Sequence, residues 1–296
     1  MRTITFLAAI TFFVVTSCCA SNSQASQTTL PKKDIGVQLY SLRDRIKTDY
    51  AGTIALIGKM GYTAVEAAGY NNGKFYGKTP EEFKADVEKA GMIVLSSHTS
   101  KALSEKELAS KDFSESLAWW DQCVANHKAA GMKYIVTPGM SVPKTLADLQ
   151  TYCDYYNAVG KKCKDNGLAF GYHNHTHEFQ KVENKLMYDY MLEHTDPQYV
   201  FFQMDVYWVV RSGHSPVEYF NKYSGRFKLL HIKDHKELGQ SGMVGFDAIF
   251  RNIDVAGTKY IIVEVEEYNF TPEESVKQSL NYLLNSSFVK NSYEKK

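Results

Sequence analysis

Short apolar stretches of strand length alternate along the chain with longer segments whose apolar residues recur at helical spacing. The order repeats from about residue 34 to residue 284 without a break. Strands are predicted at residues 34–40, 62–70, 92–100, 132–139, 168–173, 199–205, 226–234 and 259–267. Because strands that alternate with helices form parallel sheets, eight such units predict an α/β fold, a single (β/α)8 TIM barrel.

Helix boundaries support this division into units. Residues 79–91 begin with Thr79 as N-cap, Pro80 at the first helical position and Glu82 three residues after the cap, which is a capping box. A glycine, Gly61, ends the preceding helical segment. The competing interpretation, a two-domain α/β binding protein, requires a hinge and a break in the rhythm, and the sequence shows neither. We therefore predict one domain over residues 33–290.

The first residues have the layout of an export signal. Arg2 precedes the apolar run "ITFLAAITFFVVT", and small residues and cysteines follow. The stretch "VTSCC" resembles a bacterial lipobox with Cys18 as the lipidated residue, and an ordinary cleaved signal peptide is the alternative. We expect residues 1–17 to be a signal peptide and residues 18–32 a flexible tether. The protein is therefore expected in the periplasm, attached to the membrane only through a lipid at Cys18.

Composition excludes several classes of function. The net charge is +1 and no basic block occurs, which argues against nucleic acid as a partner. The body of the chain contains Cys123, Cys153 and Cys163 and no CxxC pair, so a disulfide framework is not indicated. The oligomeric state stays open between a monomer and a homodimer.

Polar side chains end every predicted strand. In (β/α)8 barrels the C-terminal ends of the strands carry the functional residues, and these ends meet at one mouth. The residues in question are Gln38, Tyr40, Glu66, His98, Thr137, His173, His175, Asp205, His231, Lys233, Glu264 and Glu266.

Three of these residues are good ligands for a divalent ion, namely Asp205, His231 and Glu264. A mixed carboxylate and imidazole shell suits Mn, Zn, Co or Fe better than Ca. The fourth ligand is expected to be His173, with Glu178 as an alternative that folds back from the loop. Each residue alone could be structural, as Asp205 would be if it capped a turn. Four such residues at the ends of consecutive strands are harder to explain without one bound divalent metal ion.

Several stretches together resemble one known group of enzymes: "IGVQLYSLRD", "GYTAVEAAGY", "GYHNHTHEF", "FQMDVYWVVRSG", "LLHIKD" and "IIVEVEEY". They are similar to the strand ends of the sugar phosphate isomerase/epimerase family, the xylose isomerase-like barrels that also include inosose dehydratase, ketose 3-epimerases and endonuclease IV. The likeness covers residues 33–285. The motifs are specific for the superfamily and weak for any one reaction.

The resemblance implies one divalent metal held by Glu, Asp, His and Glu from strands five to eight. The last three match Asp205, His231 and Glu264, whereas the fifth strand departs from the pattern with His173. In ketose epimerases of the family the glutamate at this place is also half of the acid/base pair. The replacement puts epimerisation at C3 in doubt and leaves room for β-elimination.

The reaction expected from this resemblance is proton abstraction next to the carbonyl of a carbohydrate, as in an isomerase or epimerase, with a lyase or dehydratase as the alternative. Candidate bases are Glu66, His98, His175 and Glu266, and His175 is favoured if His173 is a ligand. An imidazole can act as acid or base near neutral pH.

Candidate substrate-binding residues are Gln38, Tyr40, Trp208 and Lys233. An unphosphorylated sugar is expected, because the protein is predicted to be exported and no glycine-rich phosphate loop follows strands seven and eight.

Two other classes are weighed against this enzyme. A non-catalytic carbohydrate-binding lipoprotein could dispense with Asp205, His231 and Glu264, which this chain contains. An abasic-site endonuclease would need more metal ligands and a basic face for DNA. A small-molecule carbohydrate is therefore the expected partner.

The lipid anchor can be tested by replacing its cysteine. We expect Cys18→Ser to release the protein from the membrane fraction, because the thioether-linked lipid would be lost. Cys19→Ser is the control and should stay membrane-bound, as immunoblots of fractionated cells would show. A Cys18→Ser protein that remains in the membrane fraction would contradict the anchor, and degradation by protease added to intact cells would contradict the periplasmic orientation.

Overall fold

The computed structural model describes residue 1 and residues 32–294. The predicted signal peptide, Cys18 and almost all of the predicted tether lie outside the described residues. Within residues 32–294, no helix combines the length and apolar character needed to cross a bilayer.

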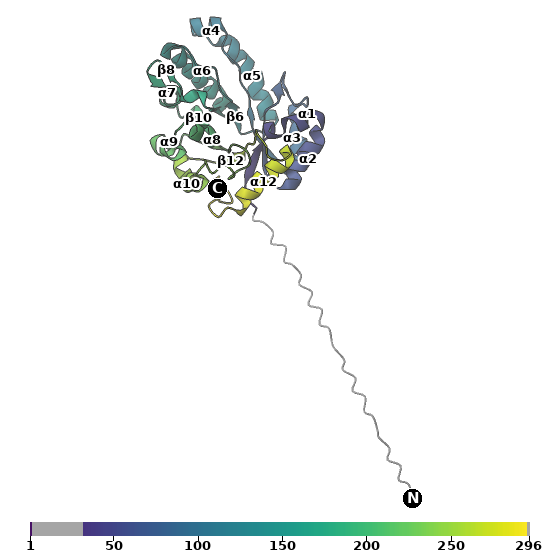
Figure 1. Cartoon of the computed structure of the whole chain (residues 1–296). Helices are drawn as coiled ribbons and strands as arrows, with labels where there is room; N and C mark the ends of the chain where they lie inside the picture. The colour runs from purple at the N-terminus through teal and green to yellow at the C-terminus, as the bar shows by residue number, and fades with distance from the viewer. Residues whose placement is uncertain (2–31, 295–296) are drawn as a thin grey trace. The chain divides into compact units, whose positions relative to one another are not determined.

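Eight parallel strands close into a barrel with helices around it (Figure 1). Neighbouring strands follow the order β1-β12-β11-β10-β7-β6-β5-β2 around the ring. Their bounds are β1 Ile35–Gln38, β2 Ala64–Ala67, β5 Ile93–His98, β6 Tyr134–Thr137, β7 Ala169–His173, β10 Val200–Asp205, β11 Leu229–Ile232 and β12 Tyr260–Val263. The predicted fold class is confirmed, and each barrel strand falls within a predicted stretch.

Helices occupy the connections between the strands. They are α1 Arg43–Thr48, α2 Tyr50–Met60, α3 Pro80–Lys89, α4 Glu105–Ser110, α5 Ser114–Ala129, α6 Leu146–Asp165, α7 Met187–His194, α8 Val206–Arg211, α9 Pro216–Lys222, α10 Phe246–Arg251, α11 Ile253–Ala256 and α12 Pro272–Asn285, with 3-10 turns η1 Leu39–Leu42 and η2 His177–Phe179. The capping box at Thr79 is confirmed, since its side chain accepts from the backbone N–H of Glu82 while the Glu82 carboxylate accepts from the N–H of Thr79. Gly61, with φ of 108°, ends α2 as predicted.

Two short antiparallel hairpins in the loops were not predicted. One pairs β3 Tyr70–Asn71 with β4 Lys74–Phe75, and the other pairs β8 Lys181–Val182 with β9 Lys185–Leu186. Helix α7 begins at Met187, because the residues directly before it pair as strand β9. Each hairpin strand is only two residues long, too short to show an alternating pattern.

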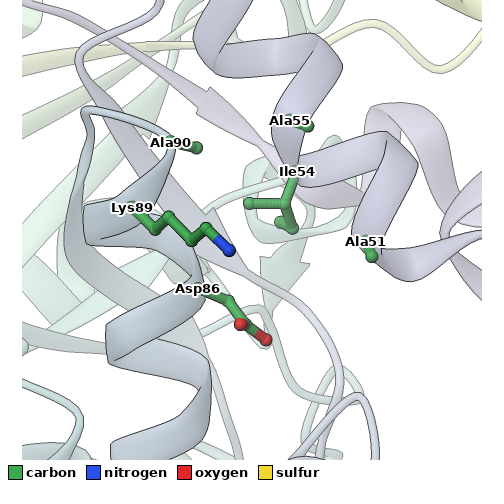
Figure 2. Close-up of a pocket in the computed structure, with 6 residues that line it drawn as sticks. All are labelled: Ala51, Ile54, Ala55, Asp86, Lys89 and Ala90. Carbon is green, nitrogen blue, oxygen red and sulfur yellow. The ribbon is translucent and has the colours of Figure 1, made fainter.

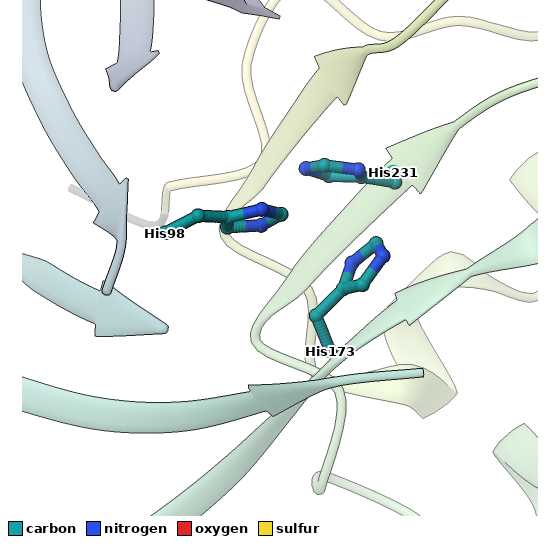
Figure 3. A group of neighbouring side chains, drawn as sticks. All are labelled: His98, His173 and His231. Carbon is teal, nitrogen blue, oxygen red and sulfur yellow. The ribbon is translucent and has the colours of Figure 1, made fainter. Parts of the chain in front are cut away.

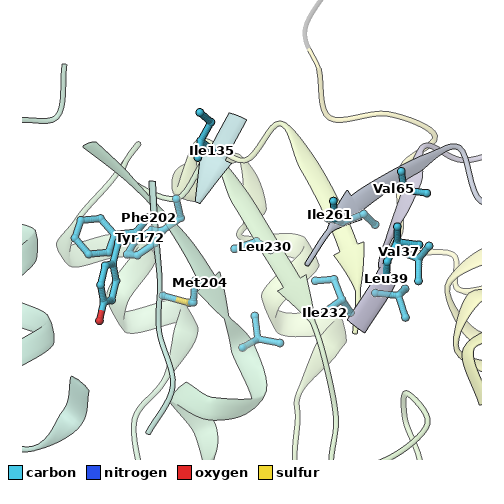
Figure 4. Packing of buried hydrophobic residues seen from close by; sticks show 14 of the residues in the cluster. Val37, Leu39, Val65, Ile135, Tyr172, Phe202, Met204, Leu230, Ile232 and Ile261 are labelled. Atoms are coloured by element: carbon cyan, nitrogen blue, oxygen red, sulfur yellow. The ribbon is translucent and has the colours of Figure 1, made fainter. Parts of the chain in front are cut away.

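The strands separate two apolar layers. Outward-facing residues such as Val37, Val65 and Leu230 pack beneath the surrounding helices (Figure 4). A smaller cluster fills the lower interior of the barrel with Ala64, Leu95, Tyr134, Val136, Phe201, Leu229, Tyr260 and Ile262. Toward the C-terminal strand ends the buried residues include polar ones, among them Glu66 and His231. Since side chains alternate along a strand, the register decides which polar groups meet at the mouth.

A β-bulge interrupts the pairing of β2 with β5. Val65 pairs with Val94, but the next residue, Glu66, pairs with Ser96, so β5 carries one extra residue, Leu95. Leu95 belongs to the interior cluster, and Ser96 also faces inward because its hydroxyl donates to Glu66. Two consecutive residues of β5 therefore point into the barrel.

A cavity of about 240 Å³ lies in the outer helical layer between α2 and α3 (Figure 2). Its lining consists of Ala51, Ile54, Ala55, Asp86, Lys89 and Ala90. None of the predicted site residues is among them, so this cavity is separate from the mouth of the barrel.

A buried chain of hydrogen bonds joins two of the longest helices to a loop at the mouth. The indole N–H of Trp120 on α5 donates to the hydroxyl of Tyr155 on α6 over 2.7 Å. That hydroxyl donates to the carbonyl of Lys101, in the loop after β5, over 2.9 Å. Both Trp120 and Tyr155 are fully buried, so water cannot replace a lost partner.

The replacement Tyr155→Phe should lower the free energy of unfolding by about 1–3 kcal/mol, because the Trp120 N–H would stay buried without an acceptor. Tyr152→Phe, one turn earlier on α6 and outside this hydrogen-bonded chain, is the matched control and should change it by less than about 0.5 kcal/mol. Urea denaturation followed by circular dichroism measures both. Equal effects of the two variants would contradict the role of the Trp120–Tyr155 pair.

Candidate metal centre and active site

Four side chains from consecutive barrel strands converge at the mouth. One ligand atom each from His173, Asp205, His231 and Glu264 can be chosen so that all four lie within 4.8 Å of one another. All four residues are buried. They come from β7, β10, β11 and the residue after β12, so the structure brings together the four residues predicted as ligands.

Asp205 offers one oxygen that the protein does not use. Its Oδ1 accepts from the backbone N–H of Trp208 and so caps α8. Asn174 holds the backbone of Asp205 by accepting from its N–H over 3.1 Å. The second oxygen, Oδ2, is buried and has no hydrogen-bond partner among the described residues. Burial raises the pKa of Asp205, and the positive charge of Lys233 opposes this rise. An orphaned carboxylate oxygen within a group of ligand atoms fits a bound cation.

His231 lies between two carboxylates. Its Nε2 is 2.6 Å from Glu66 Oε1 and its Nδ1 is 3.3 Å from Glu264 Oε2. Burial lowers the pKa of His231, but the negative charges of Glu264 and Glu66 outweigh this effect and raise it. Burial likewise raises the pKa of Glu264, and the charge of His231 more than offsets it. A carboxylate such as Glu66 on the outer nitrogen is how metal-binding histidines are commonly oriented.

Gln203 determines which nitrogen of His173 is free. Its amide Nε2 donates to the carboxylate of Glu66 over 2.8 Å, so its carbonyl oxygen must face the histidines. That oxygen lies 3.0 Å from His173 Nδ1 and 2.7 Å from His98 Nε2, and both nitrogens must donate because the oxygen only accepts. The lone pair of His173 is therefore on Nε2, where a metal ion can use it. Figure 3 shows the three imidazoles of His98, His173 and His231 turned toward one another.

Sequence reasoning missed Gln203 and Asn174, which hold the predicted ligands in place. Gln203 precedes Asp205 by two residues and therefore faces the same side of β10. Following the alternation one step back from each strand end would have found it. Asn174 follows β7 directly and also accepts from the Tyr188 hydroxyl.

A cavity of about 290 Å³ opens beside the four predicted ligands. It is lined by Tyr40, Ala68, His98, Pro138, His173, His175, Glu264 and Glu266. Of the predicted catalytic residues, His98, His175 and Glu266 thus line the cavity. Tyr40, a predicted substrate-binding residue, lies at its rim with 43% exposure.

The remaining predicted catalytic and substrate-binding residues, Gln38, Glu66, Trp208 and Lys233, do not line this cavity. Glu66 is fully buried, and its two oxygens bind Gln38 Nε2, His231, the Ser96 hydroxyl and Gln203. With its oxygens occupied, the position fits orientation of neighbouring residues better than the predicted catalytic role. Lys233 is buried with Nζ 2.8 Å from Glu266 Oε2.

Trp208 lines an adjacent groove of about 610 Å³, which shares Pro138 and His175 with the cavity. Glu178, the alternative fourth ligand, is absent from the four-residue cluster. It groups instead with His175 and His177.

Comparison with known proteins decides the family. The profile of the xylose isomerase-like TIM barrel family matches residues 54–286. The chain belongs to this family. A solved structure named sugar phosphate isomerase/epimerase, from Parabacteroides distasonis, is 35% identical with a TM-score of 0.80, covering 87% of this chain and 100% of that chain.

Other relatives of this xylose isomerase-like barrel are more distant. Inosose dehydratase from Clostridium beijerinckii is 31% identical over 81 residues, 27% of this chain, and the match spans only 26% of that relative. A solved IOLI protein with a bound zinc atom is 14% identical with a TM-score of 0.63, covering 86% of this chain and 98% of that one, a likeness that shows the fold alone. The family match and the solved relative at 35% identity confirm the predicted superfamily, and with it the prediction of an enzyme.

The ligand set of this xylose isomerase-like barrel can be tested by removing one charge. We expect Asp205→Asn to lose one equivalent of bound metal, since an amide is a far weaker ligand than a carboxylate, while its Oδ1 can still cap α8. Asp205→Ala should lose the same equivalent and, with the cap, about 1 kcal/mol of stability. Asp247→Asn, an exposed position on α10, is the control, and elemental analysis after dialysis against Mn²⁺ or Zn²⁺ is the measurement. Unchanged metal content in Asp205→Asn would show that this cluster holds no ion.

Proposed function

We propose that the protein is a metal-dependent carbohydrate enzyme of the isomerase or epimerase type that removes a proton next to the carbonyl of an unphosphorylated sugar. The observation that carries this proposal is the buried cluster of His173, Asp205, His231 and Glu264, whose open side is a cavity lined by proton-carrying side chains. Such a combination suits a small polar substrate held at a cation.

The donor set fits a divalent transition ion, with two imidazoles and two carboxylates. A divalent ion held there would act as a Lewis acid that polarises the sugar carbonyl. The protein's own contribution is to keep the ligands in place: Gln203 fixes the tautomer of His173, and Glu66 holds His231.

Glu266 is the proton acceptor that the geometry favours. Its Oε2 is held by the ammonium group of Lys233 at 2.8 Å, which leaves Oε1 for a substrate proton. His98, across the cavity on β5, is fixed through its Nε2–H by Gln203 and Glu66, so its Nδ1 is free to take up a proton and, once protonated, to return it to the substrate. His175, the base favoured from the sequence, also lines the cavity, at its border with the neighbouring groove.

The loop after β11 supports an unphosphorylated substrate. Backbone N–H groups of this loop could in principle bind a phosphate, as they do in many barrels. Here the carboxylate of Asp234 already accepts from the N–H groups of His235, Gly239 and Ser241. The loop is thus folded around an internal anion.

A lyase or dehydratase is the second candidate, and it rests on position 173. An epimerase of the two-carboxylate type passes a proton between carboxylates on opposite faces of the sugar, and His173 replaces one of them here. A site with one carboxylate base suits removal of a proton followed by loss of a β-substituent. Proteins named inosose dehydratase are among the relatives that match part of the chain.

Deuterium exchange tests the proposal directly. The metal-loaded protein is incubated in deuterated water with ketohexoses and with 3-keto-glycosides, and NMR follows the C–H next to the carbonyl. We expect exchange with at least one substrate, slowed about 100-fold or more in Glu266→Gln because a positioned base is removed. Asp247→Asn is the control and should match the wild type.

The products separate the two candidates. An inverted or isomerised sugar supports the isomerase or epimerase, and an unsaturated product with a released substituent supports the lyase. Exchange that is undiminished in Glu266→Gln and lost in His175→Ala would move the base to His175. Sugar binding without exchange or product would contradict catalysis and favour the carbohydrate-binding lipoprotein.

A further inference from the structure

A second group of ligand atoms lies in the loop after β7, outside the four-residue cluster. One atom each from His175, His177 and Glu178 can be chosen so that all three lie within 4.8 Å of one another. The two imidazoles stack with centroids 5.6 Å apart and an angle of 11° between their planes. His177 and Glu178 belong to the short 3-10 turn η2, in the loop that follows β7.

The carboxylate at the centre of the group is held rigidly. Glu178 is fully buried, and its Oε1 accepts from the Tyr172 hydroxyl over 2.7 Å. Its Oε2 accepts from the backbone N–H of His175, also over 2.7 Å. The ring Nε2 of His177 lies 3.0 Å from Oε1. The Glu178 carboxylate is therefore held in place by contacts that do not depend on any bound ion.

One nitrogen of the group has no partner. His175 Nδ1 is buried and forms no hydrogen bond with any described residue. A buried polar atom that stays unsatisfied costs about 1–3 kcal/mol, so such an atom calls for a ligand or a bound water.

The backbone leaves room where the three side chains meet. Gly139 follows β6 with φ of +108°, a conformation that favours glycine. A Cβ added there would lie 3.4 Å from His175 Nδ1, 3.6 Å from Glu178 Oε1 and 3.6 Å from His177 Cε1. The space between the ligand atoms is therefore kept open by the lack of a side chain at this position.

We propose that His175, His177 and Glu178 bind a second divalent transition-metal ion at the edge of the mouth. Two imidazoles and a carboxylate are a ligand set typical of zinc or cobalt, and three protein ligands leave a coordination position open. The open position faces the groove of about 610 Å³ that His175, His177 and Trp208 help to line. The ligand for that position is an oxygen of the substrate, such as a sugar hydroxyl, in a part of the molecule away from the reacting carbon.

The two sites are neighbours and have separate ligands. The rings of His173 and His175 have centroids 4.8 Å apart, so both sites open at the same mouth. A metal ligand cannot also serve freely as a base, so this assignment removes His175 from proton transfer and agrees with Glu266 in that role.

The experiment counts Co²⁺ equivalents and records the absorption bands of bound Co²⁺ in the full-length protein. We expect two equivalents in the wild type, one in His177→Ala and one in Asp205→Asn, with different absorption bands for the two single-site forms. His177 is the best position to change, because its side chain is 34% exposed and its loss should leave the fold intact. Glu178→Gln is a second variant with the same expected loss, and His194→Ala, an exposed histidine on α7, is the control with two equivalents.

The outcomes separate this inference from the proposed function. One equivalent in the wild type that persists in His177→Ala and is lost in Asp205→Asn would overturn the second site and leave the first in place. Removing one of three protein ligands should weaken binding of the second Co²⁺ ion at least about tenfold. If His177→Ala lowers the affinity for this ion by less than that, the second site is also overturned. Loss of one equivalent in His177→Ala but none in Asp205→Asn would support the second site and contradict the first.

Discussion

The upper half of the barrel depends on one buried carboxylate, that of Glu66. Its oxygens accept from donors on four different strands, namely Gln38, Ser96, Gln203 and His231. A charge buried without such partners would be very costly, so none of the four strands can shift without losing stability. Burial raises the pKa of Glu66, but the charges of His98 and His231 lower it well below its usual range, which keeps the group ionised. The orientation of the predicted metal ligands thus follows from a residue that is itself neither a predicted ligand nor part of the cavity wall.

The architecture could be predicted because its signal is repeated eight times. A barrel of parallel strands needs apolar residues on both faces, so each strand appears as a short apolar run between amphipathic helices. The hairpins at residues 70–75 and 181–186 carry no such signal, because their strands pair only with each other over two residues. The bulge in β5 could not be predicted either. It depends on how β5 meets Glu66 on the neighbouring strand, which is a tertiary fact.

The candidate site was partly predictable for the same reason. Parallel strands bring their C-terminal ends to one mouth, so collecting the polar residues near the end of each strand found His173, Asp205, His231 and Glu264. The rule says nothing of residues one step below the mouth, which is why Gln203 was missed and Glu66 was given a catalytic role. It also says nothing of loops. The grouping of His177 with Glu178 depends on a turn that closes over the space left by Gly139, and only the folded chain shows it.

The bulge in β5 has a consequence for the phase of its side chains. Val94 faces the helices, Leu95 and Ser96 both face inward, and Ser97 returns to the outside, where its hydroxyl bonds that of Thr99. His98 therefore points into the mouth. If β5 alternated regularly from Val94 with all of its residues kept, the same histidine would point toward the helices. Deleting Leu95, by contrast, would leave His98 facing the mouth, because Ser96 would then follow Val94 in a regular strand with the inward phase that it already has. Grafting this histidine onto a barrel with an unbroken third strand would require moving it by one position.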